Sequence, residues 1–226
     1  MEKHRYHGVV NEAIERPPAE LVAAFARHDV AKVGDAMRGY GILHYEIKPI
    51  APGMRLLGTA VTVLTRPGDA LYVARAADVA QPGDVIVIDA GGYADTAVIG
   101  DRIAYYMQAK RGVAGLVIDG GVRDVRGIRE SGFPCFARGV TPRIFGSQGP
   151  GAINVPIVCG GVPVNPGDLV LGDDDGVVVV PGDDLERVLQ LADEHLAGEL
   201  ARLDQVNQGK TLTEVQNLYG RLDSWR

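Results

Sequence analysis

The segment Gly115-Leu116-Val117-Ile118-Asp119-Gly120-Gly121-Val122-Arg123-Asp124 is the most informative stretch of the chain. Its apolar run at residues 115–118 predicts a short, buried strand. The glycine pair that follows allows a sharp turn and lets the backbone approach a small ligand closely. The segment therefore predicts a core strand that ends at a binding site.

Arg123 and Asp124 supply the chemistry at this strand end. The arginine guanidinium is a planar fork that matches a carboxylate. The aspartate offers a hard oxygen ligand for a divalent cation such as Mg²⁺. Together they indicate a site for a small anionic oxo acid. An Arg–Asp pair that only caps the next helix explains this segment alone equally well.

The composition limits the class of protein. The chain has 226 residues, 46% of them hydrophobic, with 30 glycines and a net charge of −6. Without a cluster of lysine or arginine it is not expected to bind nucleic acid, because phosphate binding needs grouped cations. The two cysteines, Cys135 and Cys159, lie in apolar surroundings and are expected to be buried thiols. We expect one domain over residues 1–226.

The chain is expected to be cytoplasmic. Residues 1–5 lead into no apolar segment of the kind found in signal peptides. No stretch approaches the roughly 20 apolar residues that cross a bilayer, so no membrane partner is expected.

The order of elements predicts an α/β protein. Predicted strands at residues 85–89, 116–119 and 156–159 each run into paired glycines, and helices are expected at 100–110 and 125–131. Strand, helix and strand at this spacing favour parallel pairing.

The C-terminal part has a different pattern. Residues 169–171 and 177–180 are expected to pair as a hairpin, with Asp173, Asp174 and Asp175 as a solvated tip. A long amphipathic helix is predicted over residues 183–208. A helix of this length, late in a compact domain, often packs on a neighbouring subunit.

Asp101 is a second candidate site residue. If a helix begins there, its free amide groups face the ligand and favour an anion. The aspartate could also hold water on a metal ion, or it could simply cap the helix. Tyr93, Arg102 and Arg143 are candidates for the distal part of the pocket.

Several other chemistries lack a motif. The five histidines do not form a His-Glu-x-x-His pattern, and no Gly-x-Ser-x-Gly elbow is present. Gly-x-Gly-x-x-Gly is absent, which argues against a dinucleotide or methyltransferase cofactor site. The only lysine near the apparent site is Lys110, so an aldolase that uses a Schiff base is disfavoured.

A series of motifs, in order along the chain, resembles the RraA-like family, which includes 4-hydroxy-4-methyl-2-oxoglutarate and 4-carboxy-4-hydroxy-2-oxoadipate aldolases. The resemblance runs from about Leu56 to Glu199. The matching motifs are Gly58-Thr59-Ala60-Val61-Thr62-Val63, Gly100-Asp101, Asp119-Gly120-Gly121-Val122-Arg123-Asp124, Asn154-Val155-Pro156-Ile157, Pro166-Gly167-Asp168 and Asp173-Asp174-Asp175-Gly176-Val177.

This resemblance implies a swivelling β/β/α domain assembled as a homotrimeric ring or as a hexamer. It also implies a metal-dependent lyase, with Mg²⁺, Mn²⁺ or another divalent cation. Such an enzyme splits a 4-hydroxy-2-oxo diacid into pyruvate and a second oxo acid through a stabilised pyruvate enolate. Oxaloacetate decarboxylation would be a side activity.

The resemblance also assigns roles to individual residues. Asp124 would ligate the metal, Asp101 would act through water on the metal, and Arg123 would hold the pyruvyl end. Glu199 of the adjoining subunit would order water near the metal. The substrate carboxylate would meet the backbone amides of Gly100, Asp101, Arg102 and Ile103.

One spacing departs from the family pattern. Between Asp101 and Arg123 lie 21 residues, one more than is usual, and the extra residue falls within 105–110. An inserted helical residue rotates the following side chains by about 100°, unless a bulge absorbs it. The family also contains proteins that bind and inhibit RNase E, so a non-catalytic regulator remains an alternative, as does a lyase for another oxo acid.

Overall fold

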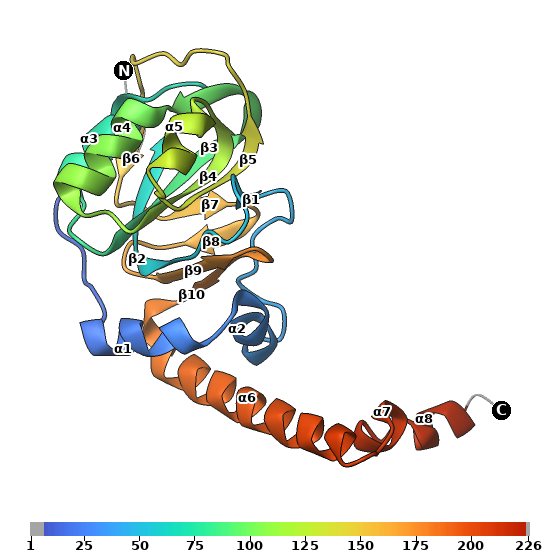
Figure 1. Ribbon diagram of the computed structural model, residues 1–226. Helices are drawn as coiled ribbons and strands as arrows, with labels where there is room; N and C mark the ends of the chain where they lie inside the picture. Colours follow the sequence, from blue (N-terminus) through green and yellow to red (C-terminus); the bar gives the residue numbers. More distant parts are fainter. Residues whose placement is uncertain (1–6, 225–226) are drawn as a thin grey trace.

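The computed structural model describes residues 7–224; the N-terminal residues that concern a signal peptide lie outside this range. A twisted sheet forms the centre, with the strand order β1-β5-β4-β3-β2-β9-β10 and β6 paired to β2 (Figure 1). Its strands are β1 (Lys48–Pro49), β2 (Leu56–Thr65), β3 (Asp84–Ile99), β4 (Gly115–Val122), β5 (Cys135–Val140), β6 (Gly151–Ile153), β9 (Leu169–Asp173) and β10 (Gly176–Val180).

Strands β2, β3, β4 and β5 pair in parallel. Of these pairings, the spacing of strands and helices predicts the one between β3 and β4. Short helices connect them and cover one face of the sheet (Figure 1). These helices are α3 (Leu71–Val79), α4 (Asp101–Tyr105), a π-helix (Tyr106–Lys110) and α5 (Val125–Glu130).

The prediction of parallel pairing is wrong for the third glycine-ended strand. β7 (Ile157–Cys159) pairs antiparallel with β8 (Val162–Val164) in a separate two-stranded sheet. Gly160 and Gly161 both have positive φ and turn the chain back at once. A parallel partner would need a crossover of a dozen or more residues, which this segment does not supply.

Three apolar layers hold the fold together. On one face of the sheet, Val61, Ile86 and Ile118 pack against the helices α3 to α5. On the other face, alternate residues of the same strands, among them Val85 and Val117, pack against β7–β8 and the β9–β10 hairpin. Successive side chains of a strand point to opposite faces, so each buried strand serves both layers.

The predicted hairpin is confirmed, because β9 and β10 pair antiparallel. The third apolar layer lies on its outer face. Side chains of β9 and β10 point alternately to the two faces of the hairpin. Those on the outer face pack against the N-terminal helices and the start of α6. These helices are α1 (Ala19–Ala24), a 3₁₀ turn (Phe25–Arg27), α2 (Val30–Ala36), a second 3₁₀ turn (Gly182–Asp184) and α6 (Leu185–Asn207).

The prediction that all three hairpin aspartates are solvated is wrong for Asp173. Its carboxylate is buried and accepts hydrogen bonds from the amides of Val30 (2.8 Å) and Asp175 (2.9 Å). The side chain therefore ties the hairpin to the start of α2.

The second half of α6 extends away from the sheet toward α7 (Leu212–Val215) and α8 (Tyr219–Asp223) (Figure 1). Its apolar stripe is buried only as far as Ala192, whereas Leu200 is 59% exposed. Over residues 7–224, no helix combines the length and apolar character that crossing a bilayer requires.

Candidate functional site

A cavity of about 810 Å³ opens between α3, the start of α4 and the two residues that follow β4. Its volume is in the range of small-molecule sites. Six of the candidate site residues line it. They are Gly100, Asp101, Arg102, Ile103, Arg123 and Asp124.

Arg123 and Asp124 follow β4 directly. Asp124 has φ 56°, a left-handed conformation that turns the chain sharply into α5. Its side chain makes no capping hydrogen bond to that helix. Instead its Oδ2 accepts a hydrogen bond from Arg123 Nε at 3.0 Å. The pair therefore faces the cavity and does not cap the helix.

The contacts of Arg123 leave the two terminal nitrogens of its guanidinium available. Its Nε donates to Asp124, and its guanidinium carbon lies 6.0 Å from the centre of the Phe145 ring. Within residues 7–224, the two terminal nitrogens have no hydrogen-bond partner. A carboxylate in the cavity can therefore meet both terminal nitrogens in a bidentate arrangement.

Glycines bring the two acidic segments together. A Cβ placed on Gly100 would lie 2.4 Å from Asp124 Oδ2, and one on Gly127 would lie 2.9 Å from Asp101 Oδ2. Both contacts are closer than real Cβ atoms make. The start of α4 and the start of α5 therefore approach so closely that a side chain at either glycine position would displace an aspartate carboxylate.

Asp101 is the first residue of α4, and Gly100 occupies the N-cap position without a side-chain cap. Capping by Asp101 is therefore not its structural role. Downstream, α4 widens into the π-helix Tyr106–Lys110, within the range 105–110 where the extra residue of the Asp101–Arg123 spacing is expected. A π-turn takes up an inserted residue and is frequent at functional sites. Asp101 and Asp124 both line the cavity.

Sequence reasoning missed the far wall of the cavity. The Tyr106 hydroxyl, on the π-helix, donates to Asp78 Oδ1 of α3 at 2.8 Å. This hydrogen bond, with smaller contributions from burial and the Asp78 charge, raises the pKa of Tyr106. Ile144 and Phe145 complete the lining. Only a helical position near Asp101 could have pointed to Tyr106.

Two other distal candidates lie elsewhere. Tyr93 and Arg143 both donate to Asp95 Oδ2, and neither lines the cavity. Of the three distal candidates, only Arg102 contributes to the wall.

The same chain does not bring Glu199 to the cavity. Glu199 lies on α6 and pairs with Lys32 of α2. Figure 1 places α6 on the opposite side of the sheet from α4 and α5. A contribution from an adjoining subunit stays a prediction.

A divalent cation fits the donor set only in part. Within residues 7–224, no group of three or more His, Cys, Asp and Glu side chains could hold a metal ion. The cavity does offer the carboxylates of Asp101 and Asp124. Mg²⁺ is commonly bound by one or two carboxylates, with water and substrate oxygens supplying the rest. These two aspartates therefore suit Mg²⁺ and are too few for a closed, all-protein site.

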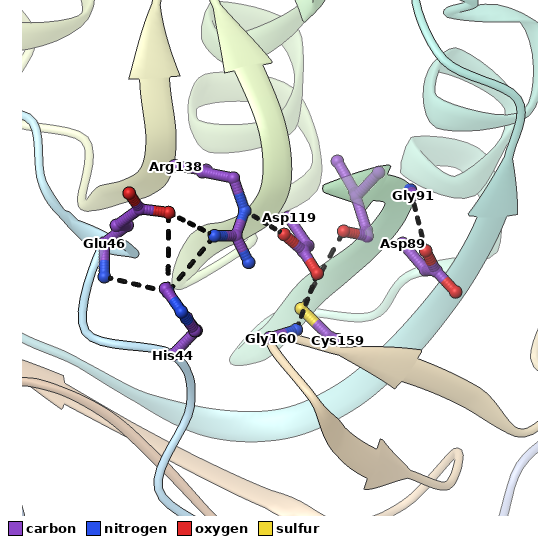
Figure 2. Close-up of polar contacts among 9 residues, drawn as sticks. His44, Glu46, Asp89, Gly91, Asp119, Arg138, Cys159 and Gly160 are labelled. Carbon is purple, nitrogen blue, oxygen red and sulfur yellow. Dashed lines mark hydrogen bonds and ion pairs between the residues drawn. The ribbon is translucent and has the colours of Figure 1, made fainter. Parts of the chain in front are cut away.

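A second polar cluster, centred on Asp119, lies within the fold, and Figure 2 shows its bonds. Asp119 accepts from Arg138 Nε at 2.6 Å and from the Gly160 amide at 2.7 Å. Arg138 also reaches Glu46. The cluster therefore joins β4 and β5 to the β7–β8 turn and to the loop before β1.

Asp89 and Cys159 lie beside this cluster. Burial, with a smaller effect of the Asp119 charge, raises the pKa of Asp89. Burial raises the pKa of Cys159 as well, and that of Cys135 to about 12. Both thiols are free and buried, as the sequence predicts.

The ordered motifs, the cavity and the Arg-Asp pair define the class. The RraA-like family (Aldolase/RraA) matches residues 30–179, and the chain belongs to this family. A relative from Halalkalibacterium halodurans is 43% identical over 183 residues, covering 81% of this chain and 87% of the relative. That relative carries the provisional name 4-hydroxy-4-methyl-2-oxoglutarate aldolase.

Solved structures agree with this fold. An uncharacterized protein from Pseudomonas syringae superposes with a TM-score of 0.80 at 29% identity, covering 92% of this chain and 97% of that one. Streptomyces coelicolor RraAS2 superposes with a TM-score of 0.73 at 31% identity, covering 88% and 100%. The latter is described as an unusual member of the RNase ES inhibitor RraA protein family.

Proposed function

We propose that this protein is a divalent-metal-dependent lyase. It cleaves a 4-hydroxy-2-oxo diacid into pyruvate and a second oxo acid, with oxaloacetate decarboxylation as a side activity. The observation that carries the proposal is the meeting of Arg123, Asp124 and Asp101 in one cavity. The aldolase name of the Halalkalibacterium halodurans relative supports the reaction class.

Arg123 binds the substrate by its carboxylate. Its terminal nitrogens form the bidentate pair, while its Nε stays hydrogen-bonded to Asp124 and fixes the guanidinium plane. The positive charge lies beside the 2-oxo group, where negative charge accumulates as pyruvate leaves as its enolate. Arg123 therefore contributes to binding and to transition-state stabilisation.

Asp124 would hold the cation, with Asp101 nearby. A divalent cation bound there supplies Lewis-acid stabilisation of negative charge on the 2-oxo oxygen. The C4 hydroxyl must lose its proton as the C3–C4 bond breaks and the bonding electrons move toward the 2-oxo oxygen. Asp101, or Glu199 of an adjoining subunit, would relay that proton through water.

The assembly belongs to the same proposal. The family resemblance implies a trimeric ring or a hexamer. The exposed Leu200, which continues the apolar stripe of α6 beyond the buried Ala192, supports packing against another subunit. Such packing would bring α6 of one subunit close to another subunit. Light scattering coupled to size exclusion would measure this mass.

A screen of 2-oxo acids for Mg²⁺-dependent pyruvate release tests the activity. The wild type should release pyruvate from oxaloacetate and from at least one 4-hydroxy-2-oxo diacid. Chelation should abolish release, and added Mg²⁺ or Mn²⁺ should restore it. Arg123→Ala and Asp124→Ala should lose it, while the exposed Arg126→Ala of α5 should keep it. No release by the wild type under these conditions would refute the proposal.

One observation favours a second candidate function. RraAS2, at 31% identity, is described within a family of RNase ES inhibitors. A non-catalytic regulator of a ribonuclease would need neither Arg123 nor Asp124 in a cavity. Retention of a ribonuclease on the immobilised protein, together with no turnover of any oxo acid, would favour this alternative.

A further inference from the structure

We propose that Arg102 selects substrates by binding the carboxylate farthest from the cleavage site, so that the cavity prefers diacids to monoacids. The inference rests on the proposed lyase function and names the substrate feature that the cavity recognises. Arg102 lines the same cavity as Arg123 and Asp124.

The first argument is the state of the two cavity arginines. Arg123 has Asp124 as a partner. The Arg102 side chain has no hydrogen bond or ion pair with any part of the chain from residue 7 to residue 224, although Asp101 is its neighbour in sequence. A guanidinium in a cavity wall without a counter-ion favours an anionic ligand group.

The second argument is that nearby cations are otherwise engaged. Arg75 pairs with Glu12 and lies 3.5 Å from Asp78. Arg111 donates to the backbone carbonyls of Ala77 and Asp78. Among the described residues that line the cavity, Arg102 is therefore the cation that remains available to a second substrate carboxylate.

The third argument concerns the acidic residue on the same wall. Asp78 would repel a substrate carboxylate if its charge were free, but it accepts a hydrogen bond from the Tyr106 hydroxyl and lies near Arg75. Arg102 and Tyr106 are four residues apart along the α4 and π-helix segment, so they share one face. The hydrogen bond from Tyr106 therefore occupies one oxygen of Asp78 on the wall that Arg102 shares.

These contacts give the cavity two anion-binding positions. Arg123 holds the carboxylate of the pyruvyl half, and Arg102 holds the carboxylate of the departing oxo acid. The apolar Ile144 and Phe145 offer contact to the carbon chain between them. A cavity of about 810 Å³ has room for a diacid of five or six carbons.

The test compares two substrates that differ at one group. 4-Hydroxy-2-oxoglutarate carries a carboxylate where 4-hydroxy-2-oxopentanoate carries a methyl group. The wild type should have the higher kcat/KM for the diacid. In Arg102→Gln the diacid-to-monoacid ratio should fall by about 10- to 100-fold, mainly through KM. Arg102→Lys should keep part of the ratio, and Tyr106→Phe should lower it less.

Arg126→Gln is the matched control. Arg126 is an arginine in the first turn of α5, its side chain is 90% exposed, and it pairs with Glu130 outside the cavity. This variant should keep the wild-type ratio. An unchanged ratio in Arg102→Gln, or a wild type that prefers the monoacid, would overturn the inference.

A binding measurement separates this inference from the lyase proposal. 2-Oxoglutarate and 2-oxopentanoate form the same matched pair but lack the 4-hydroxyl, so neither undergoes aldol cleavage. Calorimetry with Mg²⁺ should give tighter binding of 2-oxoglutarate to the wild type and a loss of that preference in Arg102→Gln. If no substrate is turned over but this preference holds, the lyase proposal fails and the diacid site stands. Equal affinity for the two acids, or no binding of either, would refute the diacid site.

Discussion

Two aspartates of the same strand region differ in how fully their oxygens are used. Asp119, within β4, is 6% exposed and has a strong donor on each carboxylate oxygen, Arg138 on one and the Gly160 amide on the other. Asp124, directly after β4, has a side chain that is 35% exposed and receives one hydrogen bond, from Arg123.

This difference separates a structural carboxylate from an available one. A buried carboxylate whose hydrogen bonds are complete stabilises the packing of the segments that it joins. A carboxylate with free lone pairs beside a cavity can bind a cation or a substrate. The same residue type, five positions along the chain, thus serves the fold in one place and offers chemistry in the other.

The largest expected effect is at Arg123, the partner of the available carboxylate Asp124. Arg123→Ala should lower kcat/KM for pyruvate release by about 10²- to 10³-fold, because it removes the charge beside the developing oxyanion. The thermal midpoint should change little, because the side chain is partly exposed. Coupled pyruvate detection and thermal unfolding measure the two effects. Turnover within about threefold of wild type would remove Arg123 from the mechanism.

Asp119→Ala should destabilise the fold by on the order of 3 kcal/mol, because it leaves the buried Gly160 amide without its acceptor and takes from Arg138 one of its two carboxylate partners. Urea unfolding followed by circular dichroism measures this change. Asp124→Ala is the matched variant and should cost about 1 kcal/mol or less, as a partly exposed surface pair does. Equal losses in the two variants would contradict the distinction between these aspartates.

The sequence predicted the elements whose signal is local. The apolar run before Gly120 marks β4, the Asp-Gly turn marks the β9–β10 hairpin, and the leucine stripe marks α6. The available site was also local, since Arg123 and Asp124 are adjacent and Asp101 begins the preceding helix. Adjacent residues and helix starts are visible without tertiary structure.

The rest depends on contacts between distant segments. Asp78 and Tyr106 are 28 residues apart and meet because α3 and the π-helix pack on the same face of the sheet. Asp119 looked like the end of a strand, and its structural role follows from Arg138 and Gly160, 19 and 41 residues away. Periodicity carries no information about such pairs. Glu199 depends on a neighbouring subunit, which a single chain does not contain.

Gly100 allows a finer test of how the position of the available carboxylate Asp124 affects activity. Gly100→Ala would place a methyl group 2.4 Å from Asp124 Oδ2, so the carboxylate must move. The backbone φ of Gly100 is −136°, which alanine adopts without strain. A shift of the carboxylate should lower kcat/KM by about 10- to 100-fold with a small effect on stability.

The control for this substitution is Gly220→Ala on α8. A Cβ there would meet no atom within 4 Å. The variant should keep full activity, which shows that adding a methyl group to a glycine is not harmful in itself. Wild-type activity in Gly100→Ala would mean that the exact position of the Asp124 carboxylate does not matter.

The smallest expected effect is on the pH dependence of stability and concerns Asp89, beside the structural carboxylate Asp119. Burial raises the pKa of Asp89, and the nearby Asp119 charge adds to this rise. The folded state therefore holds the Asp89 proton more tightly than the unfolded state. Its contribution to stability is present below the ordinary carboxyl pKa and is lost as the pH rises through the raised value.

Asp89→Asn removes this charge and retains an oxygen that can accept from the Gly91 amide. At pH 7 the variant should unfold at a higher temperature than the wild type, because the wild type carries an ionised, partly buried carboxylate beside Asp119. The difference should shrink as the pH falls, because the raised pKa makes Asp89 take up its proton at a higher pH than an ordinary carboxyl does. Thermal unfolding from pH 4 to 8 measures the gap between the two proteins, and other titrating groups cancel in the comparison. A gap that widens on acidification would mean that the Asp89 charge stabilises the cluster.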